Sequence, residues 1–359
     1  MLDGFDGSTG HPVKGALGIG LAVLLGGTVA LNDLNAEVVF PGQTWQESSP
    51  AEQGMDGNVI DGIAEALGGR GVVIRNGYLV KRWGIPQRRG DLLDASNPLL
   101  STLLWFAIEE GRVETVESKI DQYGWRLDSK DRDISFFQLA NMISGYSRPE
   151  PSGMAWSYNE FGSKLFAMTL FDRVFNSTGI AAILHRDRLG SLQFEDRPVV
   201  RDRSRTLIAS ARDFARIAWF WCQKGKWGDR QLLPRHYFDR FFRPQVDPEI
   251  PLSLEAEAND YMSLGASQGQ GEAPSVGPGL YGYGWWFNPS RTGDAGVLTW
   301  PDGPPDTCMV IGRRGNSAVL IPSLNLVLVS SFSKWGQLAV DDPESDYNQH
   351  IGALTRSVQ

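Results

Sequence analysis

Residues 71–83 read GVVIRNGYLVKRW, and this stretch decides the fold class more than any other part of the sequence. Two runs rich in β-branched and aromatic residues, 71–75 and 78–83, flank the dipeptide Asn76-Gly77. Asn-Gly between two such runs is the strongest short-range signal for a β-hairpin, because both residues tolerate the positive φ angles of its turn. The sequence therefore predicts a pair of antiparallel strands here.

Helix-type patterns follow in the middle of the chain, and strand-type patterns return at its end. Residues 99–110 are apolar on most faces and stop at Gly111, which is typical of a buried helix with a glycine at its C-terminal end. Further helices are predicted at 156–175 and 214–222, and strands at 308–312, 318–321 and 326–331. Strands from both chain ends with helices between them predict an α+β fold, in which an antiparallel sheet is flanked by helices and an all-α subdomain is inserted.

The composition argues against several classes of function. The chain has 359 residues and a formal net charge of −8, whereas a protein that binds a nucleic-acid backbone needs a basic surface. The four histidines and two cysteines show no metal-ligand spacing, so we expect neither a metal site nor a cofactor. We expect Cys222 and Cys308 to be buried free thiols in preference to a disulfide, which an oxidising compartment would allow.

Residues 15–32 read GALGIGLAVLLGGTVALN and contain no charged side chain. As a helix they would extend about 27 Å, which is enough for a thin hydrocarbon core. We expect an uncleaved transmembrane anchor in preference to a cleaved signal peptide, with residues 1–14 as a cytoplasmic tail because Lys14 precedes the apolar stretch. Residues 33–48 lack periodicity and are predicted to be a linker to a domain over residues 49–359.

Four blocks of the sequence, 72–83, 94–111, 140–162 and 309–329, resemble successive motifs of the class C β-lactamases and D-alanyl-D-alanine peptidases, which are serine hydrolases of the penicillin-binding type. The resemblance covers most of the predicted domain and implies a β-lactamase/transpeptidase-like fold. In that family a helix carries Ser-x-x-Lys, the helical subdomain adds Tyr-x-Asn, and an edge strand adds Lys/His-x-Gly. The serine attacks a carbonyl, the lysine and tyrosine move its proton, and backbone N–H groups hold the oxyanion.

The first motif is altered at both of its catalytic positions. Residues 94–104 read DASNPLLSTLL, and alignment on Ser-Thr-Leu-Leu places Asp94 at the serine position and Asn97 at the lysine position. A carboxylate is a poor acyl nucleophile, and an amide does not accept a proton at neutral pH. Apart from the resemblance, Asp94 before an apolar helix with Pro98 in its first turn is typical of a helix N-cap, and we favour that role for it.

The second and third motifs are altered as well. Residues 156–160 read WSYNE, so Tyr158 fits the family's tyrosine, but Glu160 stands in place of the asparagine. Residues 309–312 read MVIG, in which Val310 replaces the lysine or histidine and only Gly312 is kept. Glycine at this position lets the backbone approach a ligand closely. The resemblance therefore implies that three of the side chains that perform catalysis are missing.

The residues that could line the cleft of such a domain are aromatic or basic. Our candidates are Tyr158, Trp285, Trp286 and Arg313, although Tyr158 is also typical of a packed core tyrosine. The adjacent Arg313 and Arg314 are typical of a solvated pair, which we favour over a clamp for a carboxylate. The chain has 12 tryptophans, which indicate a core and a pocket wall or, alternatively, an aromatic surface that docks a partner.

These observations predict a membrane-anchored, catalytically inactive homologue that acts as a binding or structural subunit of a larger assembly. Its expected place is the bacterial inner membrane, crossed once, with the domain on the periplasmic side. Its expected partners are other membrane-protein subunits and a peptide or small molecule in the altered cleft, and not nucleic acid. The alternatives are an active hydrolase of the esterase, amidase or D-Ala-D-Ala peptidase type with non-standard catalytic residues, and a receptor that senses a β-lactam or muropeptide without a covalent bond.

Overall fold

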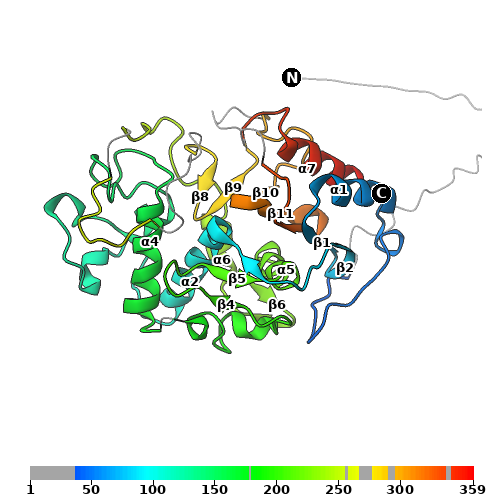
Figure 1. Cartoon of the computed structure of the whole chain (residues 1–359), viewed down its shortest axis with the longest axis horizontal. Coiled ribbons are helices and arrows are strands. Elements are labelled where there is room, and N and C mark those ends of the chain that lie inside the picture. The colour runs from blue at the N-terminus through cyan, green and yellow to red at the C-terminus, as the bar shows by residue number, and fades with distance from the viewer. Residues whose placement is uncertain (1–36, 178, 255–257, 267–276, 290–295, 337–340) are drawn as a thin grey trace, which may run out of the picture. The chain divides into compact units, whose positions relative to one another are not determined.

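The antiparallel sheet predicted from both ends of the chain is present, with seven strands among the residues that the structure describes. The computed structural model describes residues 37–177, 179–254, 258–266, 277–289, 296–336 and 341–359. The strand order is β2-β1-β12-β11-β10-β9-β8, and the paired strands are antiparallel (Figure 1). The strands are β1 (Arg70–Arg75), β2 (Tyr78–Trp83), β8 (Tyr281–Gly282), β9 (Trp285–Phe287), β10 (Cys308–Gly312), β11 (Asn316–Ile321) and β12 (Leu326–Ser331).

The hairpin of β1 and β2 has the turn that its sequence predicts. Asn76 and Gly77 both have positive φ angles, of 52° and 90°. A Cβ atom on Gly77 would lie 1.9 Å from the carbonyl oxygen of Val39, so only glycine fits at this position. The glycine therefore serves two purposes: it allows the turn, and it allows the N-terminal segment to pass close to it.

The sheet is buried on both of its faces. Val72 and Ile74 pack in one hydrophobic cluster and Val73 packs in the other, because successive side chains of a strand point to opposite faces. On the first face α5 (Ala211–Cys222) contacts β1, β11 and β12; on the second face lie α1 (Gly57–Leu67) and α7 (Asp346–Arg356), which contact each other (Figure 1). This explains why every residue of β11 and β12 is buried.

A second group of helices surrounds α2 (Asn97–Glu109), in which every residue from Pro98 to Ala107 is buried. Its neighbours are α3 (Phe136–Ala140), α4 (Glu160–Met168) and the π-helical turn η5 (Thr169–Val174). The helix predicted at 156–175 begins only at Glu160, because Asn159 caps it by accepting a hydrogen bond from the N–H of Gly162. The helix predicted at 214–222 begins earlier, after the cap residue Ser210.

Short elements complete the fold. They are η1 (Ala51–Gln53), β3 (Gly90–Asp91), η2 (Leu93–Ser96), η3 (Ile120–Tyr123), η4 (Ser129–Asp131), η6 (Ile180–Ala182), η7 (Leu189–Leu192), β4 (Val199–Val200), β5 (Leu207–Ala209), β6 (Lys226–Trp227), β7 (Arg230–Gln231), α6 (Arg235–Phe241), η8 (Arg313–Gly315) and η9 (Pro322–Leu324). Strand β5 lies between β3 and β4 in a small separate sheet. This small sheet holds the chain just before η2, which carries Asp94.

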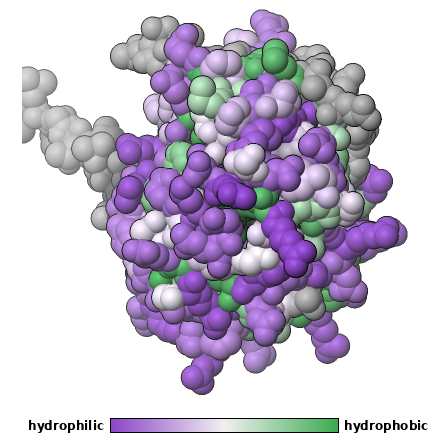
Figure 2. Space-filling view, turned by 90° about the vertical axis from the view of Figure 1, so that its left-hand side faces the viewer, coloured by the Kyte–Doolittle hydropathy of each residue, from purple (hydrophilic) through white to green (hydrophobic). Residues whose placement is uncertain are grey.

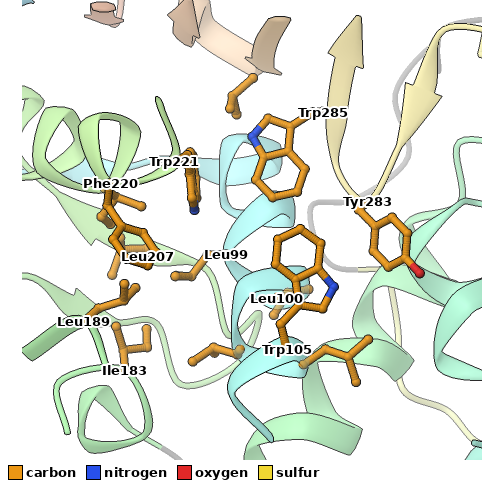
Figure 3. Close-up of a cluster of buried hydrophobic side chains, with 14 of the residues drawn as sticks. Leu99, Leu100, Trp105, Ile183, Leu189, Leu207, Phe220, Trp221, Tyr283 and Trp285 are labelled. Atoms are coloured by element: carbon orange, nitrogen blue, oxygen red, sulfur yellow. The ribbon is translucent and has the colours of Figure 1, made fainter. Parts of the chain in front are cut away.

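The clustered tryptophans belong to the core. Trp105 stacks on Trp285 with ring centroids 5.7 Å apart, and Trp221 meets Trp285 edge-on at 5.2 Å (Figure 3). The tryptophans that the sequence places close together are all buried: Trp219, Trp221, Trp227, Trp285, Trp286 and Trp300. The face of the molecule that lies on the left in Figure 1 is mainly hydrophilic, with apolar residues scattered over it (Figure 2). The prediction of a tryptophan core is confirmed, and the docking surface proposed for these residues is wrong.

The N-terminal strap, residues 37–48, is part of the folded unit, which begins at Glu37. The indole N–H of Trp219 donates a hydrogen bond to the carbonyl oxygen of Val39 at 3.2 Å. The guanidinium of Arg216, which is fully buried, donates to the carbonyl oxygen of Gly42 at 2.9 Å. The prediction of a linker that ends at residue 48 is therefore corrected, because these residues are bound along α5. Residues 33–36 lie outside the described residues.

The predicted tail at 1–14 and anchor at 15–32 also lie outside the described residues. Of the helices that the structure describes, none is both long and apolar enough to cross a membrane. Cys222 and Cys308 are both buried and carry free thiols, as the sequence indicated. Burial raises the pKa of each thiol well above its usual value.

Candidate functional site

The backbone just before Asp94 is strained. Leu93, the first residue of η2, has a φ angle of 54°, a left-handed conformation that costs a residue with a Cβ atom roughly 1–3 kcal/mol. Asp94 does not cap α2, because the residue before that helix is Ser96. The Ser96 hydroxyl instead accepts a hydrogen bond from the N–H of Leu207, at 2.9 Å. The N-cap role predicted for Asp94 is therefore wrong, and its side chain is available for other contacts.

The Asp94 carboxylate meets a cation that is shared with a second carboxylate. The guanidinium Nε of Arg313 lies 3.4 Å from Oδ2 of Asp94, and the same guanidinium forms an ion pair with Glu160. The side chain of Asp94 is 6% exposed and that of Arg313 is 35% exposed. Burial raises the pKa of Asp94, while the positive charge of Arg313 opposes this shift. Arg313 thus bridges two carboxylates. The sequence had suggested that Arg313 and Arg314 form a solvated pair, and for Arg313 this prediction is wrong.

Backbone N–H groups also lie near the Asp94 carboxyl group. Those of Arg313 and of Asp94 itself favour its ionised form, and so they oppose the rise in its pKa that burial causes. This arrangement requires the end of β10 to lie against η2. A Cβ atom on Gly312 would lie 2.6 Å from the backbone nitrogen of Ala95, so glycine is needed for the close approach. The Arg313 guanidinium and the backbone at the end of β10 therefore both lie against a single buried carboxyl group.

Asn97 and Tyr158 are brought together, as their positions in the family motifs imply. The Asn97 amide Nδ2 donates a hydrogen bond to the Tyr158 hydroxyl at 3.1 Å. Burial raises the pKa of Tyr158 well above its usual value, and the negative charge of Asp94 acts in the same direction. A tyrosine in this environment keeps its proton at neutral pH, so it is not a base.

The cleft candidates Trp285 and Trp286 lie on opposite faces of the sheet. Trp286 stacks on the ring of Tyr158, with centroids 6.3 Å apart, and is 2% exposed. Trp285 packs in the other cluster, the one that contains Trp105 and Val310, and has no exposed surface. Of these two tryptophans, Trp286 therefore adjoins the site, where its ring packs against that of Tyr158. Val310 contributes an apolar side chain to the core where the family has a cation.

Tyr281 belongs to the site, although the sequence did not single it out. Its hydroxyl is buried and has no hydrogen-bond partner among the described residues. Burial and the charge of Asp94 raise its pKa. Tyr281, Asn97 and Ser101 line a cavity of about 10 Å³, which has room for about one water molecule. The only signal in the sequence was an aromatic residue within a glycine-rich stretch, which is too general to mark a site.

The geometry brings four polar side chains together, of which Asp94 and Glu160 are buried and Tyr158 and Arg313 are partly exposed. It can neutralise charge and donate hydrogen bonds, but it has no serine at position 94 and no amine at position 97. In the described ranges, no set of three or more histidine, cysteine, aspartate or glutamate side chains could hold a metal ion.

The chain is similar to known proteins in its three-dimensional structure. No protein-family model matches it, and no curated protein matches it by sequence. A penicillin-binding protein homolog from Caulobacter crescentus superposes with a TM-score of 0.60 and 14% sequence identity, covering 88% of this chain and 99% of that one. A β-lactamase/D-alanine carboxypeptidase from Yersinia pestis gives 0.55 and 15%, covering 86% and 100%.

A β-lactamase from Mycobacterium bovis gives a TM-score of 0.55 and 14% identity, covering 84% of this chain and 100% of that one. Identities this low establish a shared fold and not a shared activity. The neighbours are nevertheless consistent with one another, and each is covered over nearly its full length. The chain therefore has the fold of the serine β-lactamases and penicillin-binding proteins, which is the fold that its sequence motifs resemble.

Proposed function

We propose that this protein is a catalytically inactive homologue of the serine β-lactamases and penicillin-binding proteins, and that it works by binding. The observation that carries the proposal is the position of the Asp94 carboxyl group, which is buried, lies near the backbone N–H of Arg313 and faces the Arg313 guanidinium. In acyl transfer, donors of this kind stabilise the oxyanion of the transition state. Here the Asp94 carboxyl group, whose pKa is raised by burial, lies beside them, and in its ionised form it would repel a developing oxyanion.

The neighbouring side chains support the same proposal. Tyr158 keeps its proton, and the Asn97 amide next to it accepts none at neutral pH. Glu160 is ion-paired with Arg313. Each group that could move a proton is therefore neutral or engaged, so the cleft has the contacts of a binding site without an attacking group.

We further propose that residues 15–32 anchor the protein in the bacterial inner membrane, with the folded unit on the periplasmic side. The support for this is the absence of charge in that stretch and the lysine that precedes it. Its glycines would allow other membrane helices to approach closely, so the partners we propose are other membrane-protein subunits. The altered cleft would take a peptide or a small molecule.

Two covalent probes test the inactivity of the full-length chain. The protein is incubated with a fluorophosphonate probe and with a fluorescent penicillin, beside an active serine β-lactamase, and run on a denaturing gel. We expect labelling of the β-lactamase alone. Labelling of this chain that disappears when a single serine is replaced by alanine would overturn the proposal and support the alternative, an active hydrolase with non-standard catalytic residues.

Alkaline carbonate extraction of membranes tests the anchor separately. The full-length chain should remain in the membrane pellet, and a variant without residues 15–32 should be released. Release of the full-length chain would contradict the anchor, and it would leave the argument about the cleft unchanged.

A further inference from the structure

Residues 224–243 are strongly basic, in a chain whose overall charge is negative. They contain six lysines and arginines against two aspartates, whereas the whole chain has a formal net charge of −8. These residues include the hairpin of β6 and β7 and the helix α6, which follow α5 in the chain. Positive charge gathered in one segment of an acidic protein indicates a surface that meets a polyanion, such as an anionic membrane or a nucleic acid.

The cations at the start of this segment outnumber the carboxylate that joins them. Asp239 pairs with Lys224 at 2.9 Å and with Arg235 at 3.4 Å, so two cations share one carboxylate. The Lys224–Asp239 pair also holds the hairpin side of the segment against α6. The side chain of Arg235 is 67% exposed, so its charge faces solvent.

The hairpin of β6 and β7 carries two further cations. Lys226 is exposed and has no ion pair among the residues that the structure describes. The side chain of Arg230 is 61% exposed and lies 3.9 Å from Asp187, a carboxylate that Arg186 also contacts at 3.6 Å. Asp229, in the turn, is the hairpin's own carboxylate. The name basic surface is used below for Lys224, Lys226, Arg230 and Arg235.

The basic surface lies where the N-terminal strap joins the folded unit. The ring of Phe40, in the strap, meets that of Trp227 in β6 edge-on, with centroids 5.6 Å apart. The backbone N–H of Val39 donates to the carbonyl oxygen of Asn76, and the N–H of Asn76 donates to that of Asn325, each at 2.9 Å. The start of the strap, the hairpin of β6 and β7 and the turns before β2 and β12 therefore lie at the same end of the large sheet.

The strap also limits the distance between this end of the sheet and the proposed anchor. Eight residue steps separate residue 32, the last of the anchor, from Phe40. An extended chain spans at most about 3.6 Å per residue, so these steps reach no more than about 29 Å. The covalent chain therefore keeps the basic surface close to the membrane in which the anchor lies.

We infer that the basic surface binds the headgroups of anionic phospholipids in the membrane that holds the anchor. The surface suits a polyanion, and its short covalent distance from the anchor favours a membrane over a nucleic acid. Each lysine or arginine near an anionic membrane adds to the attraction, which falls off within a Debye length of about 8–10 Å. The inference rests on the proposed anchor and goes beyond it, because it names the face of the folded unit that lies on the membrane.

The test places the full-length chain in lipid nanodiscs of two compositions. One kind contains phosphatidylcholine alone, and in the other about a third of the lipid is phosphatidylglycerol. The lysines are acetylated with an N-hydroxysuccinimide ester, and the rate at each position is followed by mass spectrometry. Lys226 should react more slowly in the anionic nanodiscs by about threefold or more, since lipid headgroups cover it. Salt at about 1 M should remove this difference, because the Debye length falls to about 3 Å.

Lys334 is the internal control for the acetylation rates. It is exposed, and it follows the end of β12 that lies away from the strap. Its rate should be the same in both kinds of nanodisc. A general effect of anionic lipid on the reagent would slow both lysines equally, and that result would contradict a specific surface.

Charge reversal tests the surface itself. Arg230→Glu combined with Arg235→Glu should abolish the difference in the Lys226 rate between the two lipids. Both side chains are exposed, so their surface ion pairs contribute little to stability, and circular dichroism should show an unchanged fold. The matched control is Arg88→Glu with Arg89→Glu, which makes the same change in net charge on an exposed loop between β2 and β3. This control should keep the difference.

The inference is overturned if Lys226 reacts at the same rate in both nanodiscs, or if the control variant also loses the difference, since net charge would then be the cause. It is also overturned if a DNA duplex added to neutral nanodiscs slows Lys226 while phosphatidylglycerol does not. A failed anchor is recognised separately, because the chain would then not stay in nanodiscs. In that case the same rates are compared with vesicles of the two compositions, and equal rates again overturn the inference.

Discussion

A methyl group at position 312 should force apart the two segments that form the site. A Cβ atom added to Gly312 would lie 2.6 Å from the nitrogen of Ala95, 2.9 Å from its Cβ and 3.0 Å from the carbonyl oxygen of Asn316. Gly312 has extended backbone angles, φ −138° and ψ 156°, which any residue adopts. The cost of Gly312→Ala therefore comes from steric overlap and not from backbone strain.

The size of this cost follows from the atoms that the methyl group meets. They are backbone atoms and a Cβ atom, which cannot rotate away as the end of a long side chain can. Relief requires β10 and η2 to separate by several tenths of an ångström, and this would disturb the donors around Asp94. Inserting one methyl group into packed structure costs about 1–3 kcal/mol, and we expect the upper part of this range.

The matched control is Gly62→Ala. Gly62 lies inside helix α1, is exposed, and has nothing within 4 Å of an added Cβ atom. Because alanine favours the helix by about 0.5–1 kcal/mol, this variant should be more stable than the wild type. Both variants are unfolded in urea at 25 °C and followed by circular dichroism. A Gly312→Ala protein as stable as the wild type would refute the close packing of β10 against η2.

Three more perturbations have definite outcomes. Arg313→Met should lower the free energy of unfolding by about 1–3 kcal/mol, because it takes the guanidinium away from the buried carboxyl group of Asp94. The cost is below that of a fully buried ion pair, because the Arg313 side chain is partly exposed. Adding Asp94→Asn should restore most of the lost stability in a urea double-mutant cycle, and simple additivity of the two effects would contradict the ion pair. Burial raises the pKa of Asp213 from 3.8 to about 6, so the folded protein holds this proton more tightly than the unfolded chain. The resulting stability is complete below pH 3.8 and is lost as the pH rises through 6, by roughly 3 kcal/mol; a stability difference from Asp213→Asn that stays flat from pH 4 to 7 would oppose this. Finally, the double variant Asp94→Ser with Asn97→Lys should hydrolyse a chromogenic ester measurably faster than Asp94→Ser alone. Equal rates would show that activity requires further changes besides these two side chains.

The fold could be predicted because its signals are local. The Asn76-Gly77 turn fixes the first hairpin, and the apolar runs at 318–321 and 326–331 reflect strands covered on both faces. The helix boundaries were less certain from the sequence, because they depend on single capping contacts. Asn159 and Ser210 begin their helices at positions that the apolar pattern alone does not mark.

The sequence predicted which positions in the chain form the site, but it did not predict the contacts that their side chains make. The family alignment named Asp94, Asn97 and Tyr158 together, and the structure places Asn97 and Tyr158 in contact. The alignment could not show that Arg313 contacts Asp94, because that contact joins segments far apart in the chain. Nor could it choose between neighbouring aromatic residues: Trp285 and Trp286 face opposite sides of the sheet, and a shift of one residue in register would exchange them.

The N-terminal strap decides where this protein can be shortened. A truncated protein that begins at residue 49, the boundary suggested by sequence periodicity, would lose the carbonyl groups that bind the Arg216 guanidinium and the Trp219 indole. It would also remove the contacts that the strap makes with α5, the helix that packs directly on the central strands. The shortest piece suited to expression and crystallisation therefore begins at Glu37 or earlier.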